Sequence, residues 1–482
     1  ILQTCFFAIS NVLPREEAIA KIKEAIYDTY WKKGEAVVQK NYDAVDQTLA
    51  NLYEVDYTQF VIGDKPIDAA VPDAAPDFVK QVLGRIIAGE GDELPVSAFP
   101  VDGTFPSGTT KWEKRNIADA VPVWDTSLCT QCGKCFMICP HAAIRPKVYD
   151  KTLLADAPAA WKHVDPIGKE WNKETEAYTL QVSTEDCTGC TLCVEFCPIT
   201  SKTDPGHKAI NMMDKTDIQE QEKENWDYFL TLPEVDRTRV NKNTVKGSQF
   251  FQPLFEFSGA CAGCGETPYL KLLTQLFGER MIVANATGCS SIFGGNLPTT
   301  PWTKNKEGVG PAWANSLFED NAEFGLGISM ASSKKKEMAM QLLDELRSMV
   351  GEELVDKILN NNDTTEAALH EKHELVKELK RRLSGERSMG ALNLFHLADF
   401  LEEKSIWIIG GDGWAYDIGY GGLDHVLSTG ENVNIMVLDT EVYSNTGGQK
   451  SKSTPLGSSA KFSVNGKTTG KKDLAMQAIA HG

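Results

Sequence analysis

The sequence lacks a long hydrophobic run, and it lacks an excess of positive charge. No uninterrupted apolar stretch reaches the roughly 18 residues of a membrane-spanning helix, so we expect a soluble protein. The formal net charge is −18, which disfavours nucleic acids and anionic membranes as partners because both carry dense negative charge. An initiating methionine and an export or transit segment are also absent, and the last residues stand in a helical pattern. We therefore expect both ends to be cuts in a longer chain.

Length and composition are those of a globular protein with several domains. A chain of 482 residues exceeds the roughly 250 to 300 residues at which one hydrophobic core stops growing, which predicts about three or four domains. Hydrophobic residues make up 42% and charged residues 24%, which are ordinary globular values. Residues 71–110 are rich in Pro, Gly and Ala, and they predict a small linker domain or an extended connection.

The first 34 residues predict a strand followed by a helix. Residues 6–9 indicate a short buried strand, and Cys5 beside it is expected to be a buried structural thiol. Pro14 stands where a first-turn proline belongs, and Gly34 is placed to end the helix. The apolar positions of this helix recur at helical spacing: Ile19, Ile22, Ile26 and Tyr30.

Three apolar runs after residue 245 predict buried parallel strands of an α/β domain: 281–284, 406–409 and 434–438. Each run ends in glycines or polar residues, as parallel strands do when their carboxyl ends build a site. Between the first two runs, residues 334–383 are dense in alternating Lys and Glu. This pattern predicts a solvated helical hairpin.

All but one of the twelve cysteines fall into closely spaced groups. In a long chain without export signals, such groups favour metal or cluster ligation in a reducing cytoplasm over disulfides. The motif C-x2-C-x2-C-x3-C-P occurs twice, and it is the signature of bacterial two-cluster ferredoxins, in which the fourth cysteine of each run ligates the other cluster. We assign one four-iron (4Fe-4S) cluster to Cys129, Cys132, Cys135 and Cys197, and the other to Cys187, Cys190, Cys193 and Cys139. A pair of tetrahedral zinc sites is the alternative.

Two further features surround these runs. The long gap between Pro140 and Asp186 contains Trp161 and Trp171, and it predicts an insertion that packs the cysteine module against the rest of the protein. A third set is incomplete: Cys261, Cys264 and Cys289. The simplest account is a third four-iron cluster whose fourth ligand lies beyond Gly482, while a zinc site with a histidine or a reactive thiol pair are alternatives.

Two neighbouring strand ends predict a magnesium–diphosphate site. Residues 410–413 follow one strand with the sequence GGDG, and residues 439–448 follow the next. Glycines let the backbone approach a diphosphate, and Asp412 offers a hard oxygen to Mg²⁺. The Thr440 hydroxyl and the Val442 carbonyl are the other candidate ligands. A pair of ordinary strand-ending turns is the alternative.

Several segments together resemble the pyruvate:ferredoxin oxidoreductase family of 2-oxoacid:ferredoxin oxidoreductases. They are GDGWAYDIGY at 411–420, TEVYSNTGGQ at 440–449, CAGCGE at 261–266 and ATGCS at 286–290. The opening TCFFAI at 4–9, with LPREE at 13–17, is similar to the end of the gamma-type domain of that family. Thr440 stands where many other thiamine enzymes place an asparagine, and this departure matches the family.

The resemblance implies an oxygen-sensitive homodimer of anaerobic metabolism that uses thiamine diphosphate, Mg²⁺ and three 4Fe-4S clusters. It would convert pyruvate and coenzyme A to acetyl-CoA and CO2, with ferredoxin or flavodoxin as electron acceptor. Asp412, Thr440 and Val442 would hold Mg²⁺, and Asn445 would also reach the substrate. The implied cofactor contacts are Glu266, Cys289, Gly411, Asp412, Gly413, Trp414, Thr440, Glu441, Val442, Tyr443, Ser444 and Asn445. Cys261, Cys264 and Cys289 would hold the cluster nearest the thiamine.

The expected fold is α/β and α+β multidomain. Its predicted parts are the end of a gamma-type domain (1–75), a small linker domain (76–118), a two-cluster ferredoxin domain (119–235) and a truncated thiamine-binding α/β domain (236–482). The family's activating glutamate, its substrate arginine and threonine, and its fourth proximal cysteine have no match, so this segment alone is not expected to turn over. A relative acting on 2-oxoglutarate, a branched 2-oxoacid or indolepyruvate is one alternative, and a polyferredoxin with an inactive thiamine-like domain is another.

Electron delivery to an acidic ferredoxin predicts a local patch of Lys and Arg near the outer cluster, despite the overall negative charge. Docking at such a patch should weaken as salt is added.

Overall fold

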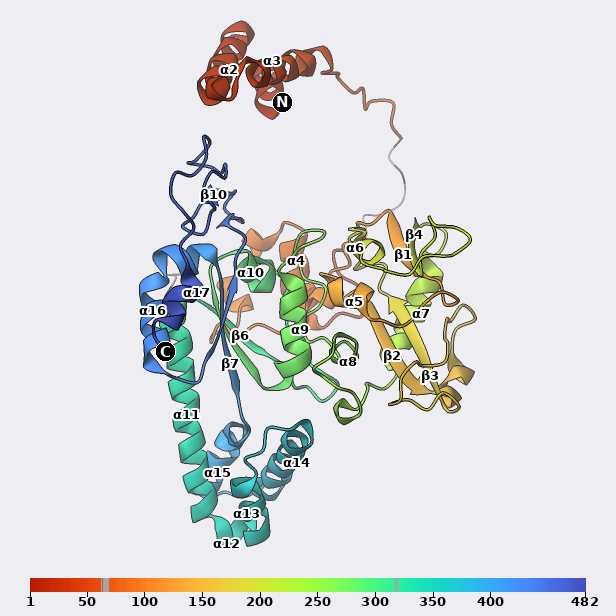
Figure 1. The fold of residues 1–482 in the computed structure, drawn as a ribbon, viewed down its shortest axis with the longest axis vertical. Coiled ribbons are helices and arrows are strands. Elements are labelled where there is room, and N and C mark those ends of the chain that lie inside the picture. Colours follow the sequence, from red (N-terminus) through yellow and green to blue (C-terminus); the bar gives the residue numbers. More distant parts are fainter. Residues whose placement is uncertain (62, 64–68, 317–319) are drawn as a thin grey trace. The chain divides into compact units, whose positions relative to one another are not determined.

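The computed structural model describes residues 1–61, 63, 69–316 and 320–482 (Figure 1). The chain divides into two compact units. One comprises Ile1–Asp68 with Thr454–Lys471, and the other comprises Ala69–Ser453 with Lys472–Gly482. Among the described residues, no helix combines the length and the apolar character needed to cross a membrane.

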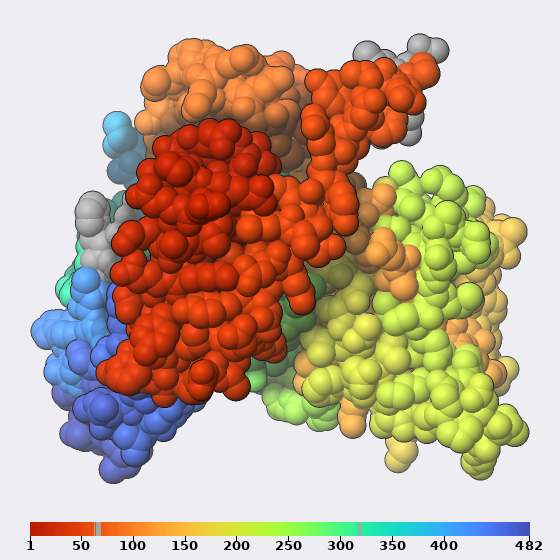
Figure 2. Space-filling view, turned by 90° about the horizontal axis from the view of Figure 1, so that it is seen from above, coloured from red at the N-terminus to blue at the C-terminus, as the bar shows by residue number. Residues whose placement is uncertain are grey.

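Three helices form the N-terminal part of the first unit: α1 (Leu2–Ser10), α2 (Arg15–Tyr30) and α3 (Glu35–Ala50). They are seen in red in Figure 2. A short 3-10 turn, Trp31–Lys33, joins α2 to Gly34, whose φ of 101° suits a glycine and ends the helix as predicted. Ala18 of α2 and Val38 and Val45 of α3 are buried between the helices.

The prediction of a buried strand at residues 6–9 is wrong, because these residues belong to helix α1. Phe6 and Ile9 are 53% and 68% exposed, and Cys5 is half-buried rather than buried. A short apolar run has no periodicity that separates a strand from a helix, so the sequence pattern could not decide between them.

Residues 69–118 begin the second unit and have a small core of their own. A π-helical turn (Val79–Leu83) leads into α4 (Gly84–Ile87), and short 3-10 turns follow at Gly91–Glu93, Val96–Ala98 and Thr110–Trp112. Val71, Ala75, Val79 and Leu83 pack together, with Trp112 against them. Gly84 allows the closest approach, since a Cβ there would lie 2.9 Å from a methyl group of Val71.

The cysteine-rich portion, which we define as residues 119–235, is built from two antiparallel strand pairs. Strand β1 (Ala120–Trp124) pairs with β4 (Ile210–Asp214), and β2 (Ile144–Asp150) pairs with β3 (Glu176–Val182). Each cysteine run leads into a short helix, α5 (Lys134–Ile138) or α6 (Leu192–Glu195). The insertion between the runs includes a 3-10 helix, Lys151–Asp156, and α7 (Gln219–Thr231) follows β4.

The buried insertion tryptophans join two packed clusters. Trp171 packs with Tyr178 and Phe250, and Trp161 packs with Trp226 and Phe257. Because Phe250 and Phe257 lie beyond residue 235, both tryptophans belong to clusters that include the following part of the chain.

The sheet portion, which we define as residues 236–453 with 472–482, contains a parallel sheet of order β6-β5-β7-β8. Its strands are β5 (Met281–Ala286), β6 (Ala312–Ser316), β7 (Ser405–Gly411) and β8 (Asn434–Leu438). The three predicted strand runs are therefore confirmed as β5, β7 and β8. Figure 1 shows α9 (Thr267–Phe277) on one side of this sheet and α11 (Asn321–Glu345) with α16 (Tyr420–Thr429) on the other.

Neighbouring side chains of β7 point to opposite faces of the sheet. Ile409 packs with Leu270 of α9, whereas Ile408 packs with Ala322 of α11 and Leu423 of α16. Shorter elements complete this portion: 3-10 turns at Arg237–Arg239 and Gly278–Arg280, α8 (Val245–Ser248), α10 (Cys289–Ser291), π-helical turns at Ile292–Asn296 and Gly413–Ile418, β9 (Val442–Tyr443), β10 (Gln449–Lys450) and α17 (Leu474–Ile479).

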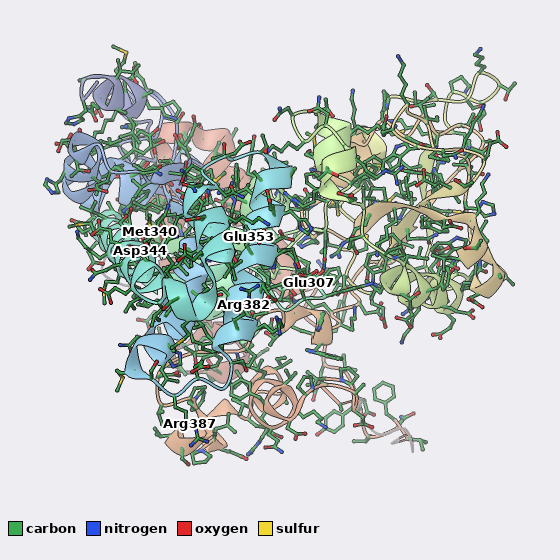
Figure 3. All side chains as sticks on the ribbon, turned by 90° about the horizontal axis from the view of Figure 1, so that it is seen from below. Glu307, Met340, Asp344, Glu353, Arg382 and Arg387 are labelled. Atoms are coloured by element: carbon green, nitrogen blue, oxygen red, sulfur yellow. The ribbon has the colours of Figure 1, made fainter. Side chains whose placement is uncertain are left out.

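The charged stretch 334–383 is helical as predicted, but it is more than a solvated hairpin. After α11 come α12 (Arg347–Val350), α13 (Glu352–Asn360) and α14 (Glu366–Leu383), then α15 (Met389–Leu397) and a 3-10 turn, Ala398–Leu401. Leu343, Ile358, Leu379 and Leu394 form a core between these helices. Figure 3 shows Glu353 and Arg382 on this helical layer, where Arg382 donates to the carbonyl of Val350 at 2.6 Å.

Candidate functional site

The first predicted cysteine set comes together at one cavity. Its lining includes all four members, Cys129, Cys132, Cys135 and Cys197, together with Trp124 and Tyr178. Burial raises the pKa of the Cys135 thiol well above its ordinary value. The backbone N–H of Gln131 donates to Sγ of Cys129 at 3.3 Å. Cys197 therefore lines the cavity of the first run and is not among the residues that line the cavity of its own run.

The second set lines a separate cavity, with Cys139, Cys187, Cys190 and Cys193 in its wall. Burial raises the pKa of the Cys187 thiol to about 12, and the N–H of Gly189 donates to its sulfur at 3.4 Å. This donor occupies the same place in its run as Gln131 does in the first, and both residues have positive φ, 67° and 55°. The repeat in sequence is thus a repeat in backbone conformation.

Both cavities suit a group that supplies positive charge to buried sulfur. A thiol binds metal as the thiolate, and burial without a cation opposes that charge. Iron offsets this penalty, and N–H donors to sulfur are a feature of iron–sulfur sites. Among the described residues, no three or more His, Cys, Asp or Glu side chains converge to hold one metal ion. The fit to clusters therefore rests on which side chains line each cavity.

The third set gathers next to the strand-end site. Cys289 begins α10 at the end of β5, and its sulfur lies near Cys261, Cys264 and Glu266. Burial raises the pKa of the Cys289 thiol to about 11, and the backbone N–H of Asn445 donates to it. Cys261 and Cys264 thus lie near Cys289 in the described structure, and the alternatives of a zinc site or a thiol pair stay open.

The loop of the third set also comes near the second set. A Cβ built on Gly263, between Cys261 and Cys264, would lie 3.8 Å from the Cβ of Cys190. Gly263 has a φ of +74°, a backbone conformation that glycine adopts readily. The loop that carries Cys261 and Cys264 therefore lies close to Cys190 of the second set.

The three candidate magnesium ligands meet where β7 and β8 end. Oγ1 of Thr440 lies 3.5 Å from Oδ1 of Asp412 and 3.1 Å from the carbonyl oxygen of Val442. Asp412 is 3% exposed, and its Oδ2 has no hydrogen-bond partner within the described part of the chain. A buried carboxylate oxygen without a partner is costly, and a hard cation would satisfy it. The donor set therefore fits Mg²⁺.

Glu266 is a second carboxyl group at this place. Its Oε2 is also buried without a partner among the described residues. Burial, and next the negative charge of Asp412, raise the pKa of Glu266 to about 7. A cofactor that donates to this carboxyl or carries positive charge beside it would relieve both costs.

The remaining predicted contacts differ in what they can offer a cofactor. Trp414 is 1% exposed and packs in the core with Ala286 and Ile408, so only its backbone remains to contact a cofactor. Gly413 is required by packing, because a Cβ there would lie 2.0 Å from the ring of Tyr443. The loop side chains Glu441, Ser444 and Asn445 lie at or near the surface. Ser444 shares a hydrogen bond of 2.6 Å with Thr440.

Sequence reasoning missed three residues that brace the Thr440 loop. The carboxylate of Asp439 accepts hydrogen bonds from Tyr416, from Ser453 and from the backbone N–H of Glu441. Glu441 has a left-handed φ of 64°, which these contacts stabilise. Asp439 directly precedes the candidate ligand Thr440 at a strand end. This position is the feature of the sequence from which its role could have been predicted.

Comparison with family models agrees with these two regions. Residues 128–228 match a model described as a 4Fe-4S double cluster binding domain, and residues 388–482 match the C-terminal TPP binding domain of thiamine pyrophosphate enzymes. Residues 65–118 match a domain of unknown function. The predicted fold class, a ferredoxin-like double-cluster part with a thiamine-binding α/β part, is confirmed.

Whole-length relatives agree as well. The chain is 57% identical to a putative pyruvate-flavodoxin oxidoreductase of Synechocystis sp., with all of this chain and 40% of the relative covered. It is 50% identical to a probable pyruvate-flavodoxin oxidoreductase of Escherichia coli, with 40% of that protein covered. It is 49% identical to pyruvate:ferredoxin oxidoreductase of Moorella thermoacetica, with 41% covered, and in both cases all of this chain is aligned.

The chain thus spans about 40% of the length of these relatives. Similarity runs through every part of the chain, from the N-terminal helices to the Thr440 loop, and it includes the two matched cofactor-binding regions. Along its whole length this chain is therefore similar to pyruvate:ferredoxin (flavodoxin) oxidoreductases, of whose length it covers about 40%.

Proposed function

We propose that the protein of which this chain is a segment oxidises pyruvate with coenzyme A to acetyl-CoA and CO2. A pair of electrons passes one at a time to flavodoxin or ferredoxin. The observation that carries the proposal is the adjacency of two features: the Asp412–Thr440–Val442 oxygens meet at the strand ends, and Cys289 lies beside Glu266 at the same edge. An electron-releasing cofactor held there would have a cysteine set within reach.

The residues divide the work as follows. Asp412, Thr440 and Val442 would hold Mg²⁺ and, through it, a diphosphate. Glu266 and the backbone of residues 411–414 would contact the cofactor, and Asn445 would face the substrate. Thiamine diphosphate, when bound, supplies the electron sink that decarboxylation requires. The protein orients the reactants and excludes water.

The cysteine sets would carry the electrons away. Three 4Fe-4S clusters are proposed, on Cys261, Cys264 and Cys289, on the set that includes Cys190, and on the set that includes Cys197. The approach of Gly263 to Cys190 supports an order in which the second set follows the third. The first set would then lie nearest the external acceptor. A homodimer, and domain limits near residues 75, 118 and 235, are part of the same proposal.

Anaerobic purification of the full-length protein tests this function. Iron, acid-labile sulfide and thiamine are counted per chain, and reduction of flavodoxin is followed with pyruvate, 2-oxoglutarate, branched 2-oxoacids and indolepyruvate. We expect bound iron and thiamine and a preference for pyruvate. Iron without thiamine would favour a polyferredoxin, zinc in place of iron would refute the electron path, and preference for another 2-oxoacid would change the substrate.

A further inference from the structure

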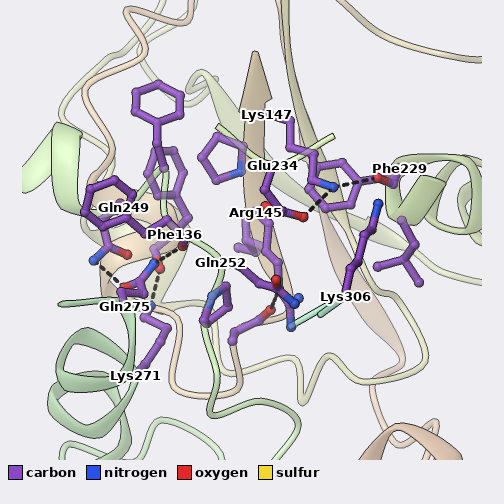
Figure 4. Close-up of a pocket in the computed structure, with 17 residues that line it drawn as sticks. Phe136, Arg145, Lys147, Phe229, Glu234, Gln249, Gln252, Lys271, Gln275 and Lys306 are labelled. Atoms are coloured by element: carbon purple, nitrogen blue, oxygen red, sulfur yellow. Dashed lines mark hydrogen bonds and ion pairs between the residues drawn. The ribbon is translucent and has the colours of Figure 1, made fainter. Parts of the chain in front are cut away.

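Lys271 is a buried cation that joins two parts of the second unit. It lies on α9, is 2% exposed, and donates to the carbonyl oxygens of Phe136, Met137 and Cys139. The Met137 and Cys139 contacts are 2.8 and 3.1 Å long. Figure 4 shows the Lys271 side chain directed toward the backbone at Phe136. All three ammonium hydrogens are therefore used.

The accepting carbonyls lie where a helix ends. Helix α5 ends at Ile138, and its last carbonyls have no partner within the helix. A cation at this place satisfies them and interacts favourably with the helix dipole. The same short segment holds Cys135 of the first set and Cys139 of the second. One side chain thus fixes a loop that contributes to both ferredoxin-type sets.

The helix that carries Lys271 is tied to the third set. Helix α9 begins at Thr267, immediately after Cys264, Gly265 and Glu266. Two further contacts hold the same junction: the Ser258 carbonyl lies 3.1 Å from Nδ1 of His141, and the N–H of Phe257 donates to the His141 carbonyl at 2.9 Å. The position of the third set relative to Cys139 and Cys190 therefore depends on this junction.

The ammonium group of Lys271 is buried without a carboxylate partner among the described residues. In the same cavity Arg145 pairs with Glu256 and Lys147 pairs with Glu234, but Lys271 has no carboxylate partner within the described residues. Neutral donors could satisfy three carbonyls, whereas a buried ammonium is costly unless negative charge lies nearby. Cys139 and Cys135 lie near its ammonium group, and as ligands of iron they would be thiolates that carry negative charge.

We propose that Lys271 is a positioning residue for electron transfer that also favours reduction of a cluster on Cys139, Cys187, Cys190 and Cys193. The proposal rests on the proposed function. Lys271 holds the Cys139 loop against α9, and its positive charge stabilises the more negative, reduced form of the cluster. Such a reduction would add one electron, given up by a cluster on the third set, and no bond or proton would change place.

The test is a redox titration of the full-length protein, followed by electron paramagnetic resonance. Lys271→Met removes the charge and the donors, and Lys271→Gln removes the charge but keeps an amide donor. The matched control is Lys306→Met, because Lys306 lines the same cavity and donates to the carbonyls of Thr231 and Leu232, away from the cysteines. We expect one cluster to shift to a more negative potential in both Lys271 variants and none in the control.

The iron content and the cluster potentials of the two Lys271 variants together support or overturn the proposal. Selective loss of one cluster in Lys271→Met, with a negative shift in Lys271→Gln, also supports the proposal. Unchanged potentials in Lys271→Gln at full iron content overturn it. Loss of all iron and of the folded circular dichroism signal in both variants also overturns it, because Lys271 would then serve the fold alone. A wild-type protein without clusters would instead refute the proposed function.

Discussion

The phenolic hydroxyl of Tyr416 donates to Oδ2 of Asp439 at 3.0 Å, which links the turn after β7 to the end of β8. Asp439 also accepts from Ser453 and from the backbone of Glu441. The next residue is Thr440, whose hydroxyl lies beside Asp412. The hydrogen bonds of Asp439 therefore help to position Thr440 and Asp412, two of the proposed Mg²⁺ ligands, although Asp439 is not itself a proposed ligand.

Asp439→Asn should weaken Mg²⁺-dependent thiamine diphosphate binding by about 10- to 100-fold, the usual cost of losing a partner that orients a metal ligand. Isothermal titration of cofactor-depleted full-length protein measures this. Asp424→Asn is the control, since Asp424 is a surface carboxylate on α16 that binds Tyr420 and His481. If Asp439→Asn and the wild type bind thiamine diphosphate with equal affinity, Asp439 does not orient a metal ligand.

Pairwise cysteine substitutions should reveal the crossed ligation. If Cys197 and Cys129 hold the same cluster, Cys197→Ala with Cys129→Ala should lose no more iron than either single variant. Cys197→Ala with Cys187→Ala should lose both clusters. Iron and sulfide analysis with paramagnetic resonance distinguishes the two patterns, and additive loss in the first pair would contradict the crossing.

Removing one partner of the buried ion pair between Arg145 and Glu256 should lower the stability of the fold strongly. Replacing both partners with apolar residues should lower it much less. Their side chains are 9% and 10% exposed, and the guanidinium also lies over the rings of Trp226 and Phe257. Arg145→Met leaves an unpaired buried carboxylate and should destabilise the fold by about 3 to 5 kcal/mol. Chemical unfolding should show that the double variant Arg145→Met, Glu256→Met recovers most of this loss.

Stability should fall slightly above neutral pH because of His373. Its pKa is raised above 6.5, first by the hydrogen bond with Glu402 at 3.0 Å, and Glu307 and Lys377 also face it. A raised folded pKa means that the stabilisation is fully present below about 6.5, the unfolded value, and is lost as pH rises through the folded pKa. Thermal unfolding should show wild type exceeding His373→Asn at pH about 5.5 and approaching it at pH about 8.5. A pH-independent gap would refute this.

Flavodoxin reduction should slow as salt is added, because exposed charges are screened over about 30 Å at 0.01 M salt but only about 8 Å at 0.15 M. Lys134 is exposed beside Cys135, and Lys246 lies against Gly133 in the first set. Lys134→Ala and Lys246→Ala should each flatten the salt dependence of the apparent KM. Lys334→Ala, on the exposed face of α11, should not. Rates independent of ionic strength would exclude this docking surface.

Motif spacing predicted the parts of the site that lie close along the chain. The cysteine runs and the strand-end loops carry strict patterns, so their members could be named from the sequence. Residues that act across long separations, such as Lys271 on Cys139 or Asp439 with Tyr416, carry no local pattern. A lysine within an amphipathic helix resembles a surface residue until the packing partner is known.

Local patterns also failed where two structures share one composition. Residues 6–9 are apolar in either a strand or a helix, and the structure has them in helix α1. The alternating charges of residues 334–383 describe the outer face of the helices, whereas Leu343, Ile358 and Leu379 form an inner face that the charges conceal. The side chain of Trp414 packs in the core between β7 and α11, a position that its motif did not indicate.

The exchange of fourth cysteines makes the two halves of the double-cluster module interdependent. Because Cys139 faces the second cavity and Cys197 the first, neither half can close its own cage, and a chain released with only one run would expose three orphan sulfurs. Under the proposed ligation, loss of one cluster would release a cysteine that belongs to the other run and would remove part of the wall of the neighbouring cavity.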